Sequence, residues 1–215
     1  MPAPGWQTRG PMDPHDDQLM SAYAHGDASA FEALYDRHRA ALYRFVRRVL
    51  GSAGAAQVDE VAQDTWLRVV QARQRWAPQG ASFRTWLFTL AHHRAIDCLR
   101  RSGRELAPPA AEDSDGPGEG VAPWQDWPDP AAREPADQAF WRAAGQRLLV
   151  CLDALPAEQR AAFLLHHEDG LSLAELATAL GLGFETAKSR LRYAMGKLRA
   201  CMGAYLPAPG TGAAG

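Results

Sequence analysis

An acidic, Pro-rich segment in the middle of the chain, residues 105–137, most limits what this sequence can fold into. It carries seven prolines and no hydrophobic period, so it predicts an extended, flexible linker. On both sides of it, apolar residues recur at the spacing of amphipathic helices, and strand patterns are lacking. The chain is therefore predicted to be all-α, with two small helical domains joined by this linker.

The predicted organisation has five parts. Residues 1–15 are expected to form a disordered tail, 16–104 a first helical domain, 105–137 the linker, 138–203 a second helical domain, and 204–215 a second tail. Ser82 is a predicted N-cap, and Pro156 is predicted in the first turn of a helix. The helices before the last two are expected at residues 16–24, 28–50, 57–75, 83–101, 138–155 and 156–168.

Charge is distributed unevenly along the chain. The formal net charge is −2, but residues 1–104 hold 14 Arg against 10 acidic residues, and residues 138–215 hold 8 basic against 6 acidic ones. The linker carries a net charge of −8 and contains Trp124 and Trp127. Two basic parts flanking an acidic connector allow nucleic-acid binding, and the connector could shield a binding face or fill a positive channel on a partner. The two tryptophans either dock on a domain or partner, or are loosely packed surface residues.

Several functional classes are not expected. No apolar run is long enough to insert into a membrane and the N-terminus has no export pattern, so the cytoplasm is the expected location. Cys98, Cys151 and Cys201 lie far apart inside apolar helical patterns and are predicted to be small core residues. The doublets His92-His93 and His166-His167 cannot place both rings on one helix face, so no metal centre is predicted. No other cofactor is predicted either. With no Gly-rich phosphate loop or nucleophile–base motif, the chain is not expected to be an enzyme.

Residues 171–199 have the pattern of a helix-turn-helix. Ser172 and Glu175 have capping-box spacing, Gly181 and Gly183 end the first helix, and a second helix restarts near Phe184. The second helix is predicted to bury Ala187, Leu191, Ala194, Met195 and Leu198.

The opposite face of that second helix is polar and basic. Such a face can enter a major groove and present donors to base edges, while flanking side chains meet phosphates. The alternative is an ordinary helix pair with a solvated basic face. The candidate base contacts are Glu185, Lys188, Ser189 and Arg192, and the candidate phosphate contacts include Thr186 and Arg190.

The helix at 83–101 interleaves aromatic and basic residues. Phe83, Trp86 and Phe88 lie close to several cationic side chains. Aromatic rings stack on unpaired bases and guanidinium groups hold the backbone, so the pattern suits single-stranded nucleic acid. The alternative is that these aromatic residues belong to the core.

Taken together, the motifs resemble the sigma-70 family of bacterial transcription initiation factors, specifically its extracytoplasmic function (ECF) group. Residues 17–104 resemble region 2 and residues 138–202 resemble region 4. The motifs that carry the resemblance are DEVAQDTWLRVV at 59–70, FRTWLFTLAHHRAIDCLRR at 83–101, LDALPAEQRAAFLL at 152–165 and TAKSRLRYAMGKLR at 186–199.

The resemblance implies partners for each half. The chain would bind core RNA polymerase through the clamp helices of the β′ subunit and through the β flap. The β′ clamp helices would contact Glu60, Gln63, Asp64 and Arg68. Region 2 would capture a base flipped from the −10 promoter element and hold the separated strand. The candidates for that role are Arg84, His92, His93, Arg94, Asp97, Arg100 and Arg101.

Two departures from the family pattern leave the promoter sequence open. Many members carry Asn where this chain has His93, and small residues are common where it has Phe184 and Glu185. Region 4 would read duplex DNA at the −35 element, with Glu185 accepting from cytosine and Lys188 or Arg192 donating to guanine. An anti-sigma factor is a further implied partner. The alternatives are a stand-alone helix-turn-helix regulator and a sigma-like mimic that sequesters an anti-sigma factor.

Overall fold

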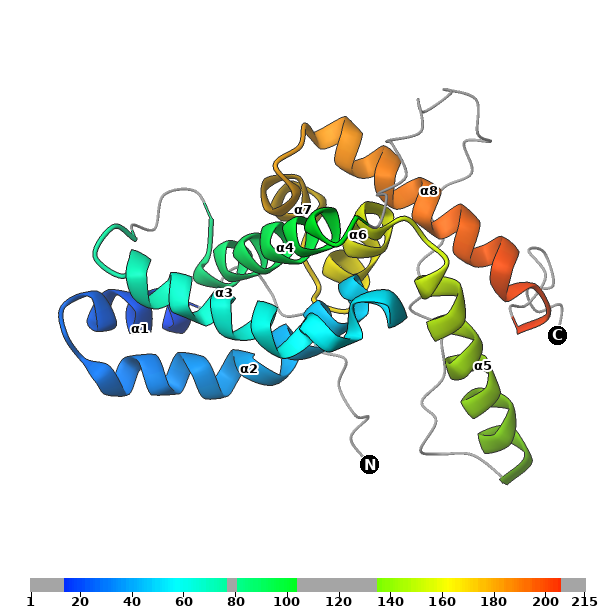
Figure 1. Cartoon of the computed structure of the whole chain (residues 1–215), viewed down its shortest axis with the longest axis horizontal. Coiled ribbons are helices and arrows are strands. Elements are labelled where there is room, and N and C mark those ends of the chain that lie inside the picture. The colour runs from blue at the N-terminus through cyan, green and yellow to red at the C-terminus, as the bar shows by residue number, and fades with distance from the viewer. Residues whose placement is uncertain (1–13, 77–80, 104–134, 206–215) are drawn as a thin grey trace, which may run out of the picture.

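A computed structural model describes residues 14–76, 81–103 and 135–205, and within these ranges all regular secondary structure is helical (Figure 1). The all-α prediction is confirmed. The predicted tails and linker, with Trp124 and Trp127, lie almost entirely outside the described residues. The elements are α1 (Pro14–Ala24), α2 (Ala28–Leu50), η1 (Ser52–Gln57), α3 (Val58–Ala72), α4 (Phe83–Arg101), α5 (Pro135–Asp153), α6 (Ala157–His167), α7 (Leu173–Leu180), α8 (Phe184–Met202) and η4 (Gly203–Tyr205).

Helices α1–α4 form the first group, with α2 packed against α1, α3 and α4. Caps fix where these helices begin: Asp27 accepts hydrogen bonds from two backbone N–H groups of α2, and Ser82 accepts from Thr85 N. In the core, Phe45 of α2 meets Phe88 of α4 edge to face, with ring centroids 5.3 Å apart. The predicted cap at Ser82 is therefore confirmed, and α4 has the predicted bounds.

The path into α3 differs from the predicted helix at 57–75. Residues 52–57 form the 3-10 helix η1, and α3 itself runs only from Val58 to Ala72. At the junction Gly51 has a φ of +63°, a backbone conformation that side-chain-bearing residues rarely adopt. The turn at Gly51 redirects the chain from α2 into η1, which the hydrophobic periodicity alone does not reveal.

Helices α5–α8 form the second group, in which α8 packs against α5, α6 and α7. The predicted capping box is present: Glu175 N donates to Ser172 Oγ, and Ser172 N donates to Glu175 Oε2 at 2.9 Å. Gly181 then ends α7 in the left-handed region, with φ 66° and ψ 35°. All five residues predicted for the inner face of α8 are buried. Pro156 precedes α6 as its N-cap, because its ψ of 139° is extended rather than helical.

A disulfide joins α5 to α8. Cys151 and Cys201 are bonded, with their Cα atoms 5.8 Å apart. The prediction that both cysteines are simply small core residues is therefore wrong. Cys151 is buried as expected, but its disulfide partner, Cys201, lies 50 positions away in the sequence.

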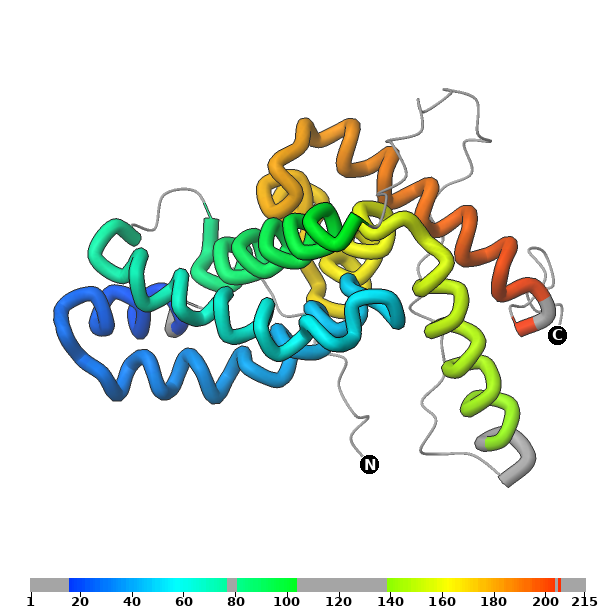
Figure 2. The backbone as a smooth tube through the Cα atoms, viewed as in Figure 1, coloured from blue at the N-terminus to red at the C-terminus, as the bar shows by residue number. Residues whose placement is uncertain are grey.

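The two groups of helices pack against each other. Helix α4 contacts α6 and α7, and α2 contacts α6, so the buried apolar residues of both groups form one continuous cluster. Helix α5 and the C-terminal half of α8 extend away from the first group (Figure 2). None of the helices in the described ranges combines the length and apolar character needed to cross a membrane.

Candidate nucleic-acid interface

The outer face of α8 is accessible. Glu185 and Lys188 lie one turn apart with a 3.7 Å contact, and their side chains are 79% and 58% exposed. Ser189 and Arg192 are half-buried, and the Arg192 guanidinium lies 5.4 Å from the centre of the Tyr193 ring. The four predicted base contacts thus share one side of the helix, in keeping with their 3.6-residue periodicity.

The two predicted phosphate contacts on α8 differ from each other. Thr186 is exposed near the start of the helix. Arg190 instead turns towards α6, where its Nη1 donates to Glu158 Oε2 at 2.5 Å and only 14% of its side chain is exposed. In this structure Arg190 is therefore engaged inside the second group of helices.

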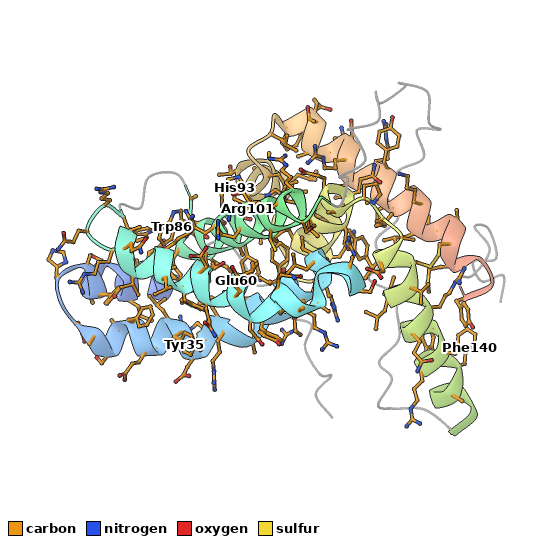
Figure 3. The ribbon with its side chains drawn as sticks, viewed as in Figure 1. Tyr35, Glu60, Trp86, His93, Arg101 and Phe140 are labelled. Atoms are coloured by element: carbon orange, nitrogen blue, oxygen red, sulfur yellow. A yellow bond between two sulfur atoms is a disulfide. The ribbon has the colours of Figure 1, made fainter. Side chains whose placement is uncertain are left out.

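Helix α4 carries the predicted single-strand contacts. His93, Arg100 and Arg101 are exposed and Asp97 is half-buried; Figure 3 places His93 and Arg101 along α4. Partial burial of the ring lowers the pKa of His93, and the neighbouring His92 lowers it further. A neutral imidazole offers one donor and one acceptor, which limits how many contacts it makes to a base.

Carboxylates of the second group of helices approach three of the α4 candidates, namely Arg84, His92 and the exposed Arg100. His92 is 3% exposed, and its Nε2 lies 3.7 Å from Glu158 Oε2. Arg100 approaches the other oxygen of the same carboxylate at 3.9 Å. Arg84 lies 3.9 Å from Asp169, a carboxylate at the end of α6 that is 5% exposed. The structure therefore separates an exposed part of the predicted −10 set from a part covered by α6.

The acidic residues of this contact were missed by sequence reasoning. The contact with His92 lowers the pKa of Glu158, burial opposes that shift, and Arg190 and Arg100 reinforce it. Burial raises the pKa of Asp169 to about 7, against the opposing effect of Arg84. The pairing joins residues from opposite sides of the linker, so no local pattern could have revealed it.

A second predicted surface lies on α3. Glu60, Gln63 and Arg68 are exposed there, and Figure 3 labels Glu60. Asp64 is less accessible, because its carboxylate forms an ion pair with Arg94 of α4 and lies 3.7 Å from Arg68. Two residues predicted for different partners, Asp64 and Arg94, thus hold α3 and α4 together.

The same face of α3 also has an apolar component. Leu67 and Val70 are 56% and 37% exposed. Exposed apolar side chains beside polar ones are typical of surfaces that bind another protein.

Family models match both halves of the chain. Sigma-70 region 2 matches residues 34–105, and Sigma-70, region 4 matches residues 145–198. The chain belongs to the sigma-70 family of RNA polymerase sigma factors, in its ECF group.

Curated relatives of similar length point to the same group. The chain is 35% identical over 187 residues to the ECF RNA polymerase sigma factor SigK of Mycolicibacterium vanbaalenii, covering 87% of this chain and 89% of the relative. It is 37% identical over 182 residues to the ECF RNA polymerase sigma factor SigL of Mycobacterium tuberculosis, covering 84% and 93%.

Two solved structures resemble this one. CnrH, in complex with the cytosolic domain of CnrY, matches with a TM-score of 0.59 and 25% identity, covering 88% of this chain and 98% of CnrH. The sigma factor RpoE of Bartonella quintana, in complex with the anti-sigma factor NepR, matches with a TM-score of 0.56 and 26% identity, covering 80% and 96%.

Proposed function

We propose that this ECF sigma factor binds core RNA polymerase, directs it to promoters with −35 and −10 elements, and assists promoter melting. The observation that carries the proposal is the accessible polar face of α8, which lies in a helix-turn-helix within the segment matched by sigma-70 region 4. A stand-alone regulator would not require a region 2 segment, and that segment matches as well.

At the −35 element, α8 is the proposed recognition helix. Its N-terminal turn presents Glu185, whose carboxylate can accept from the amino group of cytosine. Lys188 and Arg192 follow on the same face and can donate to guanine, and Thr186 is available to a phosphate. The accessibility of Glu185 and Lys188 supports this assignment.

At the −10 element, α4 is the proposed contact with the separated strand. The exposed side chains His93, Arg100 and Arg101 supply donors and positive charge, with Asp97 beside them. A flipped base gives up stacking, and cationic partners for its phosphates offset part of that cost. Arg84, His92 and Arg94 belong to the proposed contact only after their carboxylate partners release them.

The α3 face is the proposed contact with the β′ clamp helices. Glu60 and Gln63 offer a polar acidic surface, and Leu67 adds an apolar contact beside them. The second group of helices is the proposed contact with the β flap. An anti-sigma factor is a further proposed partner, since a solved relative is bound to one.

The proposed role is not enzymatic. Sigma factors are transcription initiation factors, and the polymerase carries out the chemistry of RNA synthesis. Because bacterial core polymerase works in the cytoplasm, we propose that location for this chain.

A reconstituted transcription assay tests the proposal. The purified chain is added to core polymerase on supercoiled genomic DNA, and the 5′ ends of the transcripts are mapped. We expect a defined set of start sites that share two upstream elements and need both components. A chain that forms no complex with core polymerase overturns the proposal, and stable binding without transcripts favours a sigma-like mimic.

A further inference from the structure

A groove lies between the C-terminal end of α2, the 3-10 helix η1 and the C-terminal part of α5. In Figure 1 the cyan turn of η1 approaches the upper end of α5, where the groove is found. Its volume of about 330 Å³ is at the lower end of the roughly 300–1,000 Å³ of ligand pockets, so it suits a few side chains of a larger partner. None of its lining residues belongs to the promoter-binding or β′-binding sets proposed above, so its role lies beyond the proposed function.

One wall of the groove is cationic. Arg47 and Arg48 of α2 line it together with Arg160 of α6, against the single lining carboxylate of Asp153. That carboxylate accepts from Arg160 Nη1 at 2.8 Å, so its charge is already compensated. Arg48 also pairs with Glu168, whereas Arg47 is exposed at the rim. Positive charge therefore exceeds negative charge in the lining, and an acidic occupant is favoured.

The floor of the groove is held in place by a close approach at Gly51. A Cβ atom at Gly51 would overlap the side chains of Asp153 and Arg160, so only glycine fits there. Ser52 then donates to Asp153 from its backbone N–H at 3.1 Å and from its hydroxyl at 2.5 Å. Arg160 is only 6% exposed. An occupant therefore meets a preformed surface, and little further ordering of the groove is needed on binding.

The α5 side of the groove is apolar. Leu149 and Val150 are 51% and 59% exposed, on a helix that packs against α8 with its other face. Exposed aliphatic side chains beside arginines are typical of surfaces that bind another polypeptide. Arginine side chains also stack on aromatic rings. The groove thus suits a segment that combines large apolar or aromatic side chains with carboxylates.

One segment of this chain has that composition. Residues 123–130, PWQDWPDP, carry Trp124 and Trp127 together with Asp126 and Asp129. Their three prolines favour the polyproline II conformation, which has three residues per turn. In that conformation the two tryptophans, three positions apart, would share one edge, and the two aspartates would share another. Prolines also reduce the conformational freedom that is lost on docking.

We propose that residues 123–130 dock in this groove of their own chain, with the indole rings against the apolar side of α5 and the carboxylates beside the arginines. Trp127 precedes Pro135, the first residue of α5, by eight positions, which span about 26 Å when extended. Val150 lies 15 positions into the helix, about 22 Å along its axis. A segment that runs back beside α5 therefore reaches the groove. The tether also gives an effective concentration on the order of mM, so a contact that is weak between separate molecules is well occupied here.

Fluorine NMR on the full chain, labelled with fluorotryptophan, tests the docking. Trp124→Phe and Trp127→Phe assign the two signals, because each variant loses one resonance. We expect both signals to be shifted and broadened relative to a labelled peptide of residues 118–134, which is the undocked reference. Val150→Asp and Arg47→Glu change exposed side chains of the groove and should return both signals to the peptide positions. Salt at about 1 M, where the Debye length is about 3 Å, should shift them in the same direction.

Two matched controls should leave both signals in place. Arg39→Glu makes the same charge change on α2, where Arg39 pairs with Asp36 of its own helix, and Leu67→Asp adds the same charge at an exposed apolar position of α3. Circular dichroism reports whether each variant folds.

Peptide-like signals in the unchanged chain overturn the docking. Shifted signals that neither groove variant moves overturn it as well, because the segment would then bind elsewhere. Signals that return to the peptide positions on dilution also overturn it, because a second copy of the chain would then supply the segment. No polymerase or DNA is present in the sample, so each of these results leaves the proposed function untouched.

Discussion

At the residue scale, the proposed DNA contact of α8 depends on a few side chains that point outward, opposite the buried face of the helix. Lys188 is exposed, and Arg192 is half-buried with its guanidinium beside the Tyr193 ring. Their removal leaves the inner face of α8 intact, because that face consists of other residues.

We predict that Lys188→Ala and Arg192→Ala each lower promoter-directed transcription by about ten-fold, because a good base-edge contact contributes roughly 1–3 kcal/mol. Binding to core polymerase should not change. Titration of each variant against a mapped promoter checks the first statement, and co-purification with core polymerase checks the second. The control Arg142→Ala removes an exposed Arg from α5. Equal loss in the control would contradict the assignment of the α8 face.

Asp64 has two roles. It lies on the α3 face proposed to bind polymerase, and its carboxylate pairs with Arg94 of α4. We predict that Asp64→Arg weakens binding to core polymerase by about ten-fold or more, because it places like charges against Arg94 and reverses a charge on the proposed polymerase contact. Fluorescence titration with labelled core polymerase measures this. Glu32→Arg makes the same charge change at an exposed position of α2 and should bind normally.

Asp169 makes the stability of the folded chain depend on pH, in a direction set by its raised pKa. Its pKa is raised by burial from 3.8 to about 7, so the folded chain holds a proton there that the unfolded chain loses. The contribution of Asp169 to stability is fully present below about pH 4 and is lost as pH rises to about 7. We predict that Asp169→Asn matches the unchanged chain near pH 4 and becomes relatively more stable by a few kcal/mol towards pH 7.

Thermal unfolding of both proteins across this range measures the difference. His167 acts in the opposite direction, because burial and His166 lower its pKa to about 4, and it is present in both proteins. The comparison therefore cancels it. A difference in Tm that does not grow with pH would contradict the raised pKa of Asp169.

At the element scale, local chemistry made α7 and α8 predictable. The capping box, the left-handed Gly181 and the 3.6-residue period all act within a few residues, and the structure agrees with each. The bounds of α4 could be predicted in the same way, because Ser82 caps its first turn. By contrast, η1 was not predicted, because a 3-10 turn after Gly51 has no hydrophobic period of its own.

The link between α5 and α8 could not be predicted, because Cys151 and Cys201 meet only when the second group of helices is assembled. Closing a loop of this length constrains the unfolded chain, so we predict that reduction lowers the free energy of unfolding by about 2–4 kcal/mol. Thermal unfolding with and without a reductant measures the effect. Cys201→Ser should abolish the response to reductant, and Cys98→Ser should retain it; the reverse pattern would contradict the pairing.

At the scale of the whole molecule, the sequence divides the chain and the structure brings its parts together. The acidic linker and the two basic halves predict two helical domains, but no pattern predicts that α6 and α7 cover α4. His92, Arg84 and Arg190 therefore have partners that were not foreseen, because Glu158 and Asp169 reach them only through tertiary packing. The exposed candidates, Glu185 and Lys188, depend on helix periodicity alone and were predicted correctly as outward-facing.

The central claim is that α8 contacts the −35 element while α4 holds the separated strand of the −10 element. Promoter opening tests this claim most directly. A fluorescent base analogue is placed in the −10 element of a promoter mapped by transcription, and its emission reports loss of stacking. We predict that emission rises only when both the chain and core polymerase are present, and that Arg100→Ala with Arg101→Ala reduces the rise while binding to duplex −35 DNA persists. Opening by core polymerase without the chain, or stable promoter binding by the complex with no rise in emission, would contradict the account.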